Sequence, residues 1–91
     1  MYVSAVSAWE IAIKASLGRL VTQRRVPDVV AESGFEELPI RLAHAERVQT
    51  LPWHHRDPFD RMLAAQARAE GLTLVTRDRI YGLTEWRGRQ F

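Results

Sequence analysis

The sequence predicts a single small α/β domain in which helices cover a parallel sheet. Helical segments with recognisable start and stop residues alternate along the chain with short apolar runs, which is the pattern of layered α/β proteins. One of these runs, Leu72–Thr76, is rich in apolar and β-branched residues, as in strands that are buried on both faces. The 91 residues fit one domain, which we place at residues 1–91 and expect to have a thin hydrophobic core.

The composition limits the compartment and the partners. The chain has no Cys, so it has no disulfide or thiol nucleophile, and a reducing cytoplasm is the expected location. The apolar stretch Val3–Ile13 is interrupted by Glu10 and is too short for a membrane span of about 20 residues. The net charge is +2, and every basic residue except Lys14 is Arg. An Arg-rich surface is compatible with nucleic acid, although a coding bias toward Arg explains it at least as well.

Three elements are predicted in the first half of the chain. The first is a helix over Ser7–Gly18, with Ser7 as its N-cap and the glycine at its end. A short helix opens at Pro27, because proline favours the first helical turn, and it ends at Gly34. Phe35–Ile40 alternates weakly between polar and apolar residues and contains a proline, so we expect a short strand there.

The second half begins with a predicted helix over Arg41–Thr50, whose apolar residues recur at three-residue spacing. The clearest helix of the chain covers Pro58–Glu70, because an aspartate–proline pair opens it and a glycine follows it. Leu72–Thr76 then forms a strand. The tail, Arg79–Phe91, mixes glycines with aromatic residues and indicates no clear element.

Glu10 lies inside the apolar stripe of the first predicted helix. This stripe consists of Val6, Trp9, Ile13 and Leu17. Trp9 is accordingly expected in the core. A carboxylate in such a stripe needs a compensating partner, because an unpaired buried charge is costly. An ion pair with Lys14 or a capping box with Ser7 would supply a purely structural role, and these readings stay open beside a functional one.

Two aspartates also stand at positions that acids usually avoid. Asp60 lies at the centre of a small-residue face of the Pro58–Glu70 helix, and its alternative role is to complement the helix dipole. Asp57 is fully explained as the N-cap of that helix. Asp78 follows the predicted strand Leu72–Thr76, at the end where ligands bind in open α/β sheets. Its alternative role is to cap the turn that comes next.

Together, Glu10, Asp60 and Asp78 predict an acidic metal site. Three carboxylates at inward-facing or strand-end positions repel one another unless a cation lies between them. Oxygen ligands with no histidine in register select Mg²⁺ or Mn²⁺. Such a site activates water and stabilises the charge that develops during displacement at a phosphodiester, which is the chemistry of a nuclease.

Four segments of the chain resemble the PIN-domain ribonucleases, in particular the VapC toxins of toxin–antitoxin pairs. They carry the motifs WEIAIK, HHRDPFDRMLAAQA and LVTRD in this order and spacing, and they cover nearly all of the chain up to about Tyr81. The segments are Ser4–Leu20, Phe35–Ile40, Leu51–Ala67 and Leu72–Asp78.

The resemblance implies a three-layer α/β/α fold with a parallel sheet. It also implies a Mg²⁺-dependent (or Mn²⁺-dependent) endoribonuclease, a hydrolase that cleaves RNA and is silenced by a cognate antitoxin. The helix glutamate of the family motif corresponds to Glu10, the aspartate of the long helix to Asp60, and the aspartate after the following strand to Asp78. These three residues would be both catalytic residues and metal ligands. Thr76 matches the polar residue that often precedes the last acid, and with Asp57 it is a second-tier candidate.

The sequence departs from the family pattern at its start. Family members begin with a strand that carries the first catalytic aspartate, followed by a helix, and Met1–Ser7 supplies neither that strand nor that acid. We therefore expect a PIN-like domain that lacks the family's first strand and helix. The uncovered sheet edge and apolar helix faces would favour a homo-oligomer. The alternative function is that of a non-catalytic PIN remnant, an antitoxin-binding or oligomerisation module.

Overall fold

The computed structural model describes residues 1–19, 24–52 and 57–84. In these ranges none of the helices is long and apolar enough to cross a bilayer. The elements are β1 (Tyr2–Ser4), α1 (Ala5–Ser16), α2 (Val26–Glu32), β2 (Glu36–Leu38), α3 (Leu42–Val48), α4 (Pro58–Glu70) and α5 (Arg77–Thr84).

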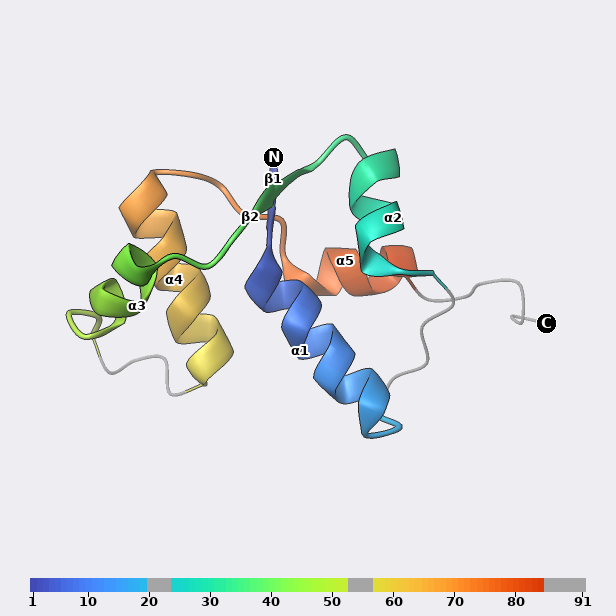
Figure 1. Cartoon of the computed structure of the whole chain (residues 1–91), viewed down its shortest axis with the longest axis horizontal. Coiled ribbons are helices and arrows are strands. Elements are labelled where there is room, and N and C mark those ends of the chain that lie inside the picture. The colour runs from blue at the N-terminus through green and yellow to red at the C-terminus, as the bar shows by residue number, and fades with distance from the viewer. Residues whose placement is uncertain (20–23, 53–56, 85–91) are drawn as a thin grey trace.

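A small parallel sheet lies between two groups of helices. It consists of β1 and β2, paired so that Val3 lies opposite Glu37. Helices α3 and α4 lie on one side of the strands, and α1, α2 and α5 lie on the other (Figure 1). Helix α3 packs against α4, α2 against α5, and α1 against both α4 and α5. This arrangement confirms the predicted α/β fold class, with helices on both sides of a parallel sheet.

Local capping explains where α1 and α4 begin. Ser4 is extended, and its Oγ accepts a hydrogen bond from the N–H two residues further on, at 3.0 Å. The predicted cap at Ser7 is therefore wrong, because β1 runs directly into α1 and Ser7 is buried within the helix. Asp57 caps α4 as predicted, since its Oδ1 accepts from two first-turn N–H groups at 2.8 and 3.4 Å.

Two glycines follow helices where the sequence predicts helix ends. Gly34 and Gly71 have φ angles of +72° and +63°, a conformation that residues with a Cβ rarely adopt. Helix α4 has the predicted bounds, and α2 lies within two residues of its predicted bounds. Helix α3 and strand β2 fall inside the ranges predicted for them.

The chain after α4 differs from the prediction. Leu72–Thr76 is not a regular strand, because only Leu74 forms a parallel bridge, to Tyr2 of β1. The next residues form α5, which the sequence pattern did not indicate. The side chain of Thr76 explains where this helix starts, since its Oγ accepts a hydrogen bond from the N–H of Arg79 at 3.3 Å. Thr76, and not Asp78, therefore acts as the cap.

The core is small, and α1 turns a different face to it than the apolar stripe predicts. The buried cluster consists of Val3, Ile11, Val75 and Ile80. Trp9 is 57% exposed, so its predicted place in the core is wrong. The buried residues of α1 are Val6, Ser7, Glu10 and Ile11. Because β1 runs directly into α1, the strand fixes the rotation of the helix and leaves Trp9 at its outer edge.

A buried polar network joins the start of α1 to α3 and α4. The hydroxyl of Ser4 donates a hydrogen bond to the side-chain oxygen of Gln66 on α4. His44 on α3 is fully buried, and its Nδ1 accepts from the N–H of Arg41 at 3.0 Å. Its Nε2 lies 2.7 Å from a carboxylate oxygen of Glu70. Polar side chains thus make part of the contact between α3 and α4, because each of them finds a hydrogen-bond partner inside the protein.

The cap of α4 gives a first prediction. Asp57→Ala removes the acceptor of two first-turn N–H groups, so the free energy of unfolding should fall by about 1 kcal/mol. Asp57→Asn is the matched control, because asparagine caps helices about as well as aspartate and should leave the stability nearly unchanged. Urea unfolding followed by circular dichroism measures both variants, and an equal loss in both would contradict a capping role.

Candidate acidic site

Glu10 is the buried member of the candidate site. It lies on α1 and is only 4% exposed, as its position in the apolar stripe predicts. Its Oε2 accepts a hydrogen bond from Nη1 of Arg77 at 2.7 Å and lies 3.4 Å from Nζ of Lys14. The Lys14 ion pair that the spacing allows is therefore present. The shorter contact comes from a residue 67 positions away in the sequence.

Asp60 approaches the same guanidinium group from α4. Its Oδ1 lies 3.6 Å from Nη1 of Arg77, and its side chain is 40% exposed. Asp60 is half-buried on the face of α4 that lies toward Arg77, and the buried residues of α4 are others. They are Arg61, Ala65 and Gln66. A single nitrogen of Arg77 thus lies close to carboxylates from two helices.

Arg77 is held in its charged form by these contacts. Its hydrogen bond to Glu10, and then the negative charge of that carboxylate, raise the pKa of Arg77 above its already high ordinary value. Asp60 and Asp57 add weaker attractions, and partial burial acts in the opposite direction. The cation that neighbouring carboxylates require is therefore supplied by the chain itself.

Glu10 nevertheless keeps one unsatisfied oxygen. Its Oε1 is buried and has no hydrogen-bond partner among the residues that the structure describes. A buried acceptor without a partner costs about 1–3 kcal/mol. Such atoms in folded proteins call for an explanation, for example a functional role or a bound ion.

Asp78 and Thr76 lie at the start of α5. Asp78 is exposed in the first turn, where its charge complements the helix dipole. Within residues 1–19, 24–52 and 57–84, no three or more His, Cys, Asp or Glu side chains are grouped so as to hold a metal ion. The structure therefore brings Glu10 and Asp60 together without adding Asp78 to them, and the three-acid site stays a prediction.

A divalent metal ion does not fit this arrangement as it stands. Mg²⁺ needs oxygen ligands at about 2.0–2.1 Å in a nearly octahedral geometry. Nη1 of Arg77 already lies close to Oε2 of Glu10 and Oδ1 of Asp60. Binding of a metal ion to both carboxylates would require the guanidinium group to move.

An aromatic pair borders the two acids. Trp9 precedes Glu10 and Phe59 precedes Asp60 in the sequence. The two rings meet edge to face, with 5.1 Å between their centroids and 72° between their planes. Because Trp9 is mostly exposed, this end of the contact between α1 and α4 presents an aromatic surface beside the acids.

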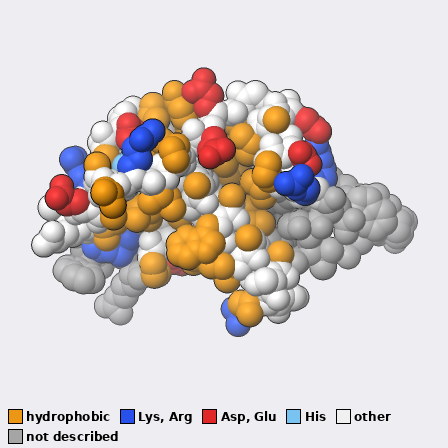
Figure 2. Space-filling model, viewed as in Figure 1, with side chains coloured by type: hydrophobic (Ala, Val, Ile, Leu, Met, Phe, Trp, Pro, Cys, Tyr) orange, Lys and Arg blue, Asp and Glu red, His pale blue; other side chains and the backbone are white. Residues whose placement is uncertain are grey.

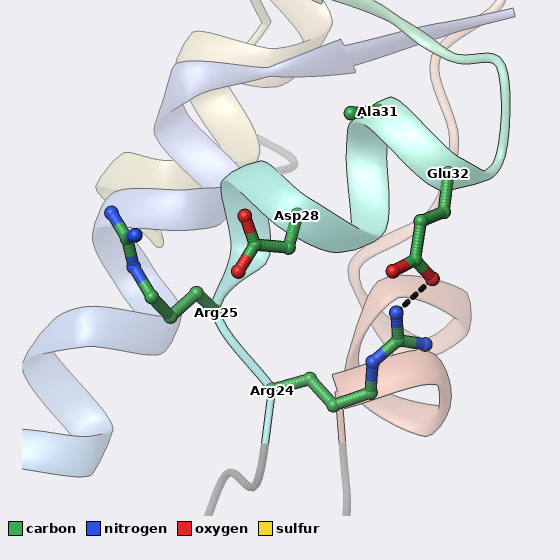
Figure 3. Close-up of a pocket in the computed structure, with 5 residues that line it drawn as sticks. All are labelled: Arg24, Arg25, Asp28, Ala31 and Glu32. Carbon is green, nitrogen blue, oxygen red and sulfur yellow. Dashed lines mark hydrogen bonds and ion pairs between the residues drawn. The ribbon is translucent and has the colours of Figure 1, made fainter.

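The two larger of the pockets found among the described residues lie apart from the acids. The first, of about 440 Å³, lies along α2 (Figure 3) and is lined by Arg24, Arg25, Asp28, Ala31 and Glu32. Arg24 pairs with Glu32 across it, and the lining contains two arginines and two acids. The second, of about 430 Å³, is mostly apolar and is lined by residues of β1, α1 and α2 and by Phe35 and Glu37. Neither pocket includes Glu10, Asp60 or Arg77.

Sequence reasoning missed Arg77 as a member of the candidate site. Arg77 stands between Thr76 and Asp78 in the motif LVTRD, so it adjoins a predicted site residue. One electrostatic signal could have pointed to it, because a carboxylate in an apolar stripe needs a neighbouring cation. That cation can come from a residue distant in the sequence as well as from Lys14.

The burial of Glu10 gives a second prediction. Glu10→Gln should lower the free energy of unfolding by about 1–3 kcal/mol, because it removes the charged acceptor of Arg77. Glu32→Gln is the matched control. It also breaks an ion pair with an arginine, but the Glu32 side chain is 63% exposed, so the loss should stay below about 1 kcal/mol. Urea unfolding in EDTA compares the two, and equal losses would contradict the role given to Glu10.

Comparison with known proteins identifies the family. The profile of the PIN domain matches residues 1–85, a range that contains all the elements described above. No curated protein and no solved structure gives a significant match. PIN domains are generally nucleases that use divalent metal ions, and the mixed α/β fold with its small parallel sheet agrees with the match. The chain therefore belongs to the PIN domain family.

Proposed function

We propose that this PIN domain is a Mg²⁺-dependent endoribonuclease, located in the cytoplasm, and the toxin of a toxin–antitoxin pair. The carboxylate of Glu10 is the observation that carries the proposal. It is buried on α1, it faces Asp60 across one guanidinium group, and its Oε1 has no partner among the described residues. The unsatisfied Oε1 costs free energy even though Arg77 compensates the charge of the carboxylate, so this oxygen favours a site kept for function.

In this proposal Glu10, Asp60 and Asp78 are the catalytic residues and the ligands of Mg²⁺ or Mn²⁺. When bound, such an ion activates water and stabilises charge on a phosphodiester. Thr76 caps α5 and thereby sets where the helical turn with Asp78 begins. Asp57 caps α4 and thereby fixes the turn that carries Asp60. These two residues act as positioning residues.

The aromatic surface beside the acids supports RNA as the substrate. Unpaired bases of single-stranded RNA stack on exposed aromatic side chains. Trp9 and Phe59 each adjoin a candidate catalytic acid. The side chains of Lys14 and Arg77 are 42% and 36% exposed and provide positive charge for a phosphate backbone.

Exposed apolar side chains support protein partners, namely a cognate antitoxin and a second copy of the chain. Leu42 is 91% exposed and Leu17 is 60% exposed. Hydrophobic side chains also gather across the middle of the face shown in Figure 2. Among the described residues, β1 is the only strand paired with β2, which leaves one edge of β2 open. Such edges and patches are typical of surfaces that bind another chain.

A non-catalytic PIN domain that serves as an antitoxin-binding or oligomerisation module is the second candidate function. Arg77 is the observation that favours it, because its guanidinium group already neutralises Glu10 and Asp60. In that case the acidic site would be a structural ion-pair cluster, and the exposed apolar surface would carry the function.

Cleavage of a labelled single-stranded RNA tests the proposal. We expect cleavage with Mg²⁺, none with EDTA, and a rate about 100-fold or more lower in Asp60→Asn. Asp28→Asn is the matched control, since it removes an exposed carboxylate on α2 and should cleave at the unaltered rate. A chain that forms stable dimers but cleaves no RNA in Mg²⁺ or Mn²⁺ would contradict the nuclease and favour the second candidate.

A further inference from the structure

We propose that Arg77 is a built-in competitor of the divalent cation, so that the carboxylates of Glu10 and Asp60 bind either the guanidinium group or a metal ion, but not both. This inference rests on the proposed function, from which it takes a divalent metal ion as the ligand. It goes beyond that function because it assigns to Arg77 control over when the site accepts a metal ion.

The position of Arg77 supports exclusive occupancy. Its Nη1 lies 2.7 Å from Oε2 of Glu10 and 3.6 Å from Oδ1 of Asp60. A metal ion bound to the same two oxygens would lie about 2.0–2.1 Å from each of them. It would therefore meet Nη1 at a distance where two positive charges repel strongly in a partly buried site. One cation must leave before the other can bind.

The surroundings of Arg77 allow its guanidinium group to be displaced from Glu10. Its side chain is 36% exposed and belongs to the first residue of α5, so the guanidinium group reaches solvent without any change in the core. Lys14 stays beside Oε2 of Glu10 at 3.4 Å after Arg77 has left. Oε1 of Glu10, which lacks a partner among the described residues, adds a free donor for the incoming metal ion. Displacement of Arg77 thus leaves no buried charge unpaired.

Lys14 provides a matched comparison. Lys14 and Arg77 both pair with Oε2 of Glu10, so removal of either one takes a single positive charge from the same carboxylate. Only Arg77 also contacts Asp60. A general electrostatic effect on metal affinity should therefore be similar in the two variants, whereas exclusive occupancy should make Arg77→Gln differ from Lys14→Gln.

Binding of Mn²⁺ tests this inference without any RNA. Free Mn²⁺ is measured by electron paramagnetic resonance in titrations of the wild type, Arg77→Gln and Lys14→Gln. We expect Arg77→Gln to bind Mn²⁺ about tenfold or more tightly than the wild type, and more tightly than Lys14→Gln. In the double variant with Arg77→Gln, we expect Asp60→Asn to abolish this increase in Mn²⁺ affinity. The inference would be overturned if Arg77→Gln bound Mn²⁺ with the affinity of the wild type or did not bind it at all. It would also be overturned if Lys14→Gln gained as much Mn²⁺ affinity as Arg77→Gln.

A measurement on the wild type covers the case in which Arg77→Gln does not fold. The guanidinium N–H signals of Arg77 in ¹⁵N-resolved NMR spectra report its hydrogen bond to Glu10. Millimolar Mg²⁺ should shift or broaden these signals toward those of a free arginine. Signals that stay unchanged at these concentrations would contradict displacement.

The results also separate this inference from the proposed function. Tighter Mn²⁺ binding by Arg77→Gln without cleavage of RNA would support the competition and reject the nuclease. Metal-dependent cleavage of RNA, with no increase in the Mn²⁺ affinity of Arg77→Gln, would support the nuclease and reject the competition.

Discussion

The hydrogen bond between Arg77 and Glu10 joins the first helix of the chain to the last described one, and the candidate site is built around it. A carboxylate that is only 4% exposed is costly without a counter-ion, and α5 supplies the nearer of its two counter-ions, a guanidinium group 2.7 Å away. The same packing brings Ile11 and Ile80 into the apolar cluster. The capping of α4 by Asp57 then places Asp60 beside the same arginine. The fold and the candidate site therefore share one electrostatic contact.

The parts of the fold that the sequence predicts are those with a complete local signal. Helix α4 has its cap, its proline and its terminal glycine within one continuous segment, so its bounds need no knowledge of the rest of the chain. The predictions are wrong where a segment distant in the sequence determines the local structure. Ser7 has the right chemistry for a cap, but β1 continues into α1 and Ser4 takes that role. Leu72–Thr76 has the composition of a strand, yet only Leu74 pairs with β1.

In the candidate site, too, local contacts follow from the sequence and long-range contacts do not. The burial of Glu10 follows from its position on the helix, and its pairing with Lys14 follows from the spacing of four residues. The contact with Arg77 spans 67 positions, and neither periodicity nor a motif predicts it. Trp9 shows the limit of the helical pattern, because α1 is rotated relative to the predicted stripe and exposes it. The role of Asp78 remains a prediction, since the structure groups it with no set of metal-binding side chains among the described residues.

The central claim is that Glu10 and Arg77 stabilise each other across the interior, and a double-mutant cycle tests it most directly. The free energies of unfolding of the wild type, Glu10→Gln, Arg77→Gln and the double variant in EDTA give the coupling free energy between the two side chains. We predict a favourable coupling of about 1–3 kcal/mol. The corresponding cycle for Glu10 and Lys14, which lie four residues apart on one helix, should give only about 0.3–0.5 kcal/mol. A coupling between Glu10 and Arg77 that is no larger than this value would contradict the account.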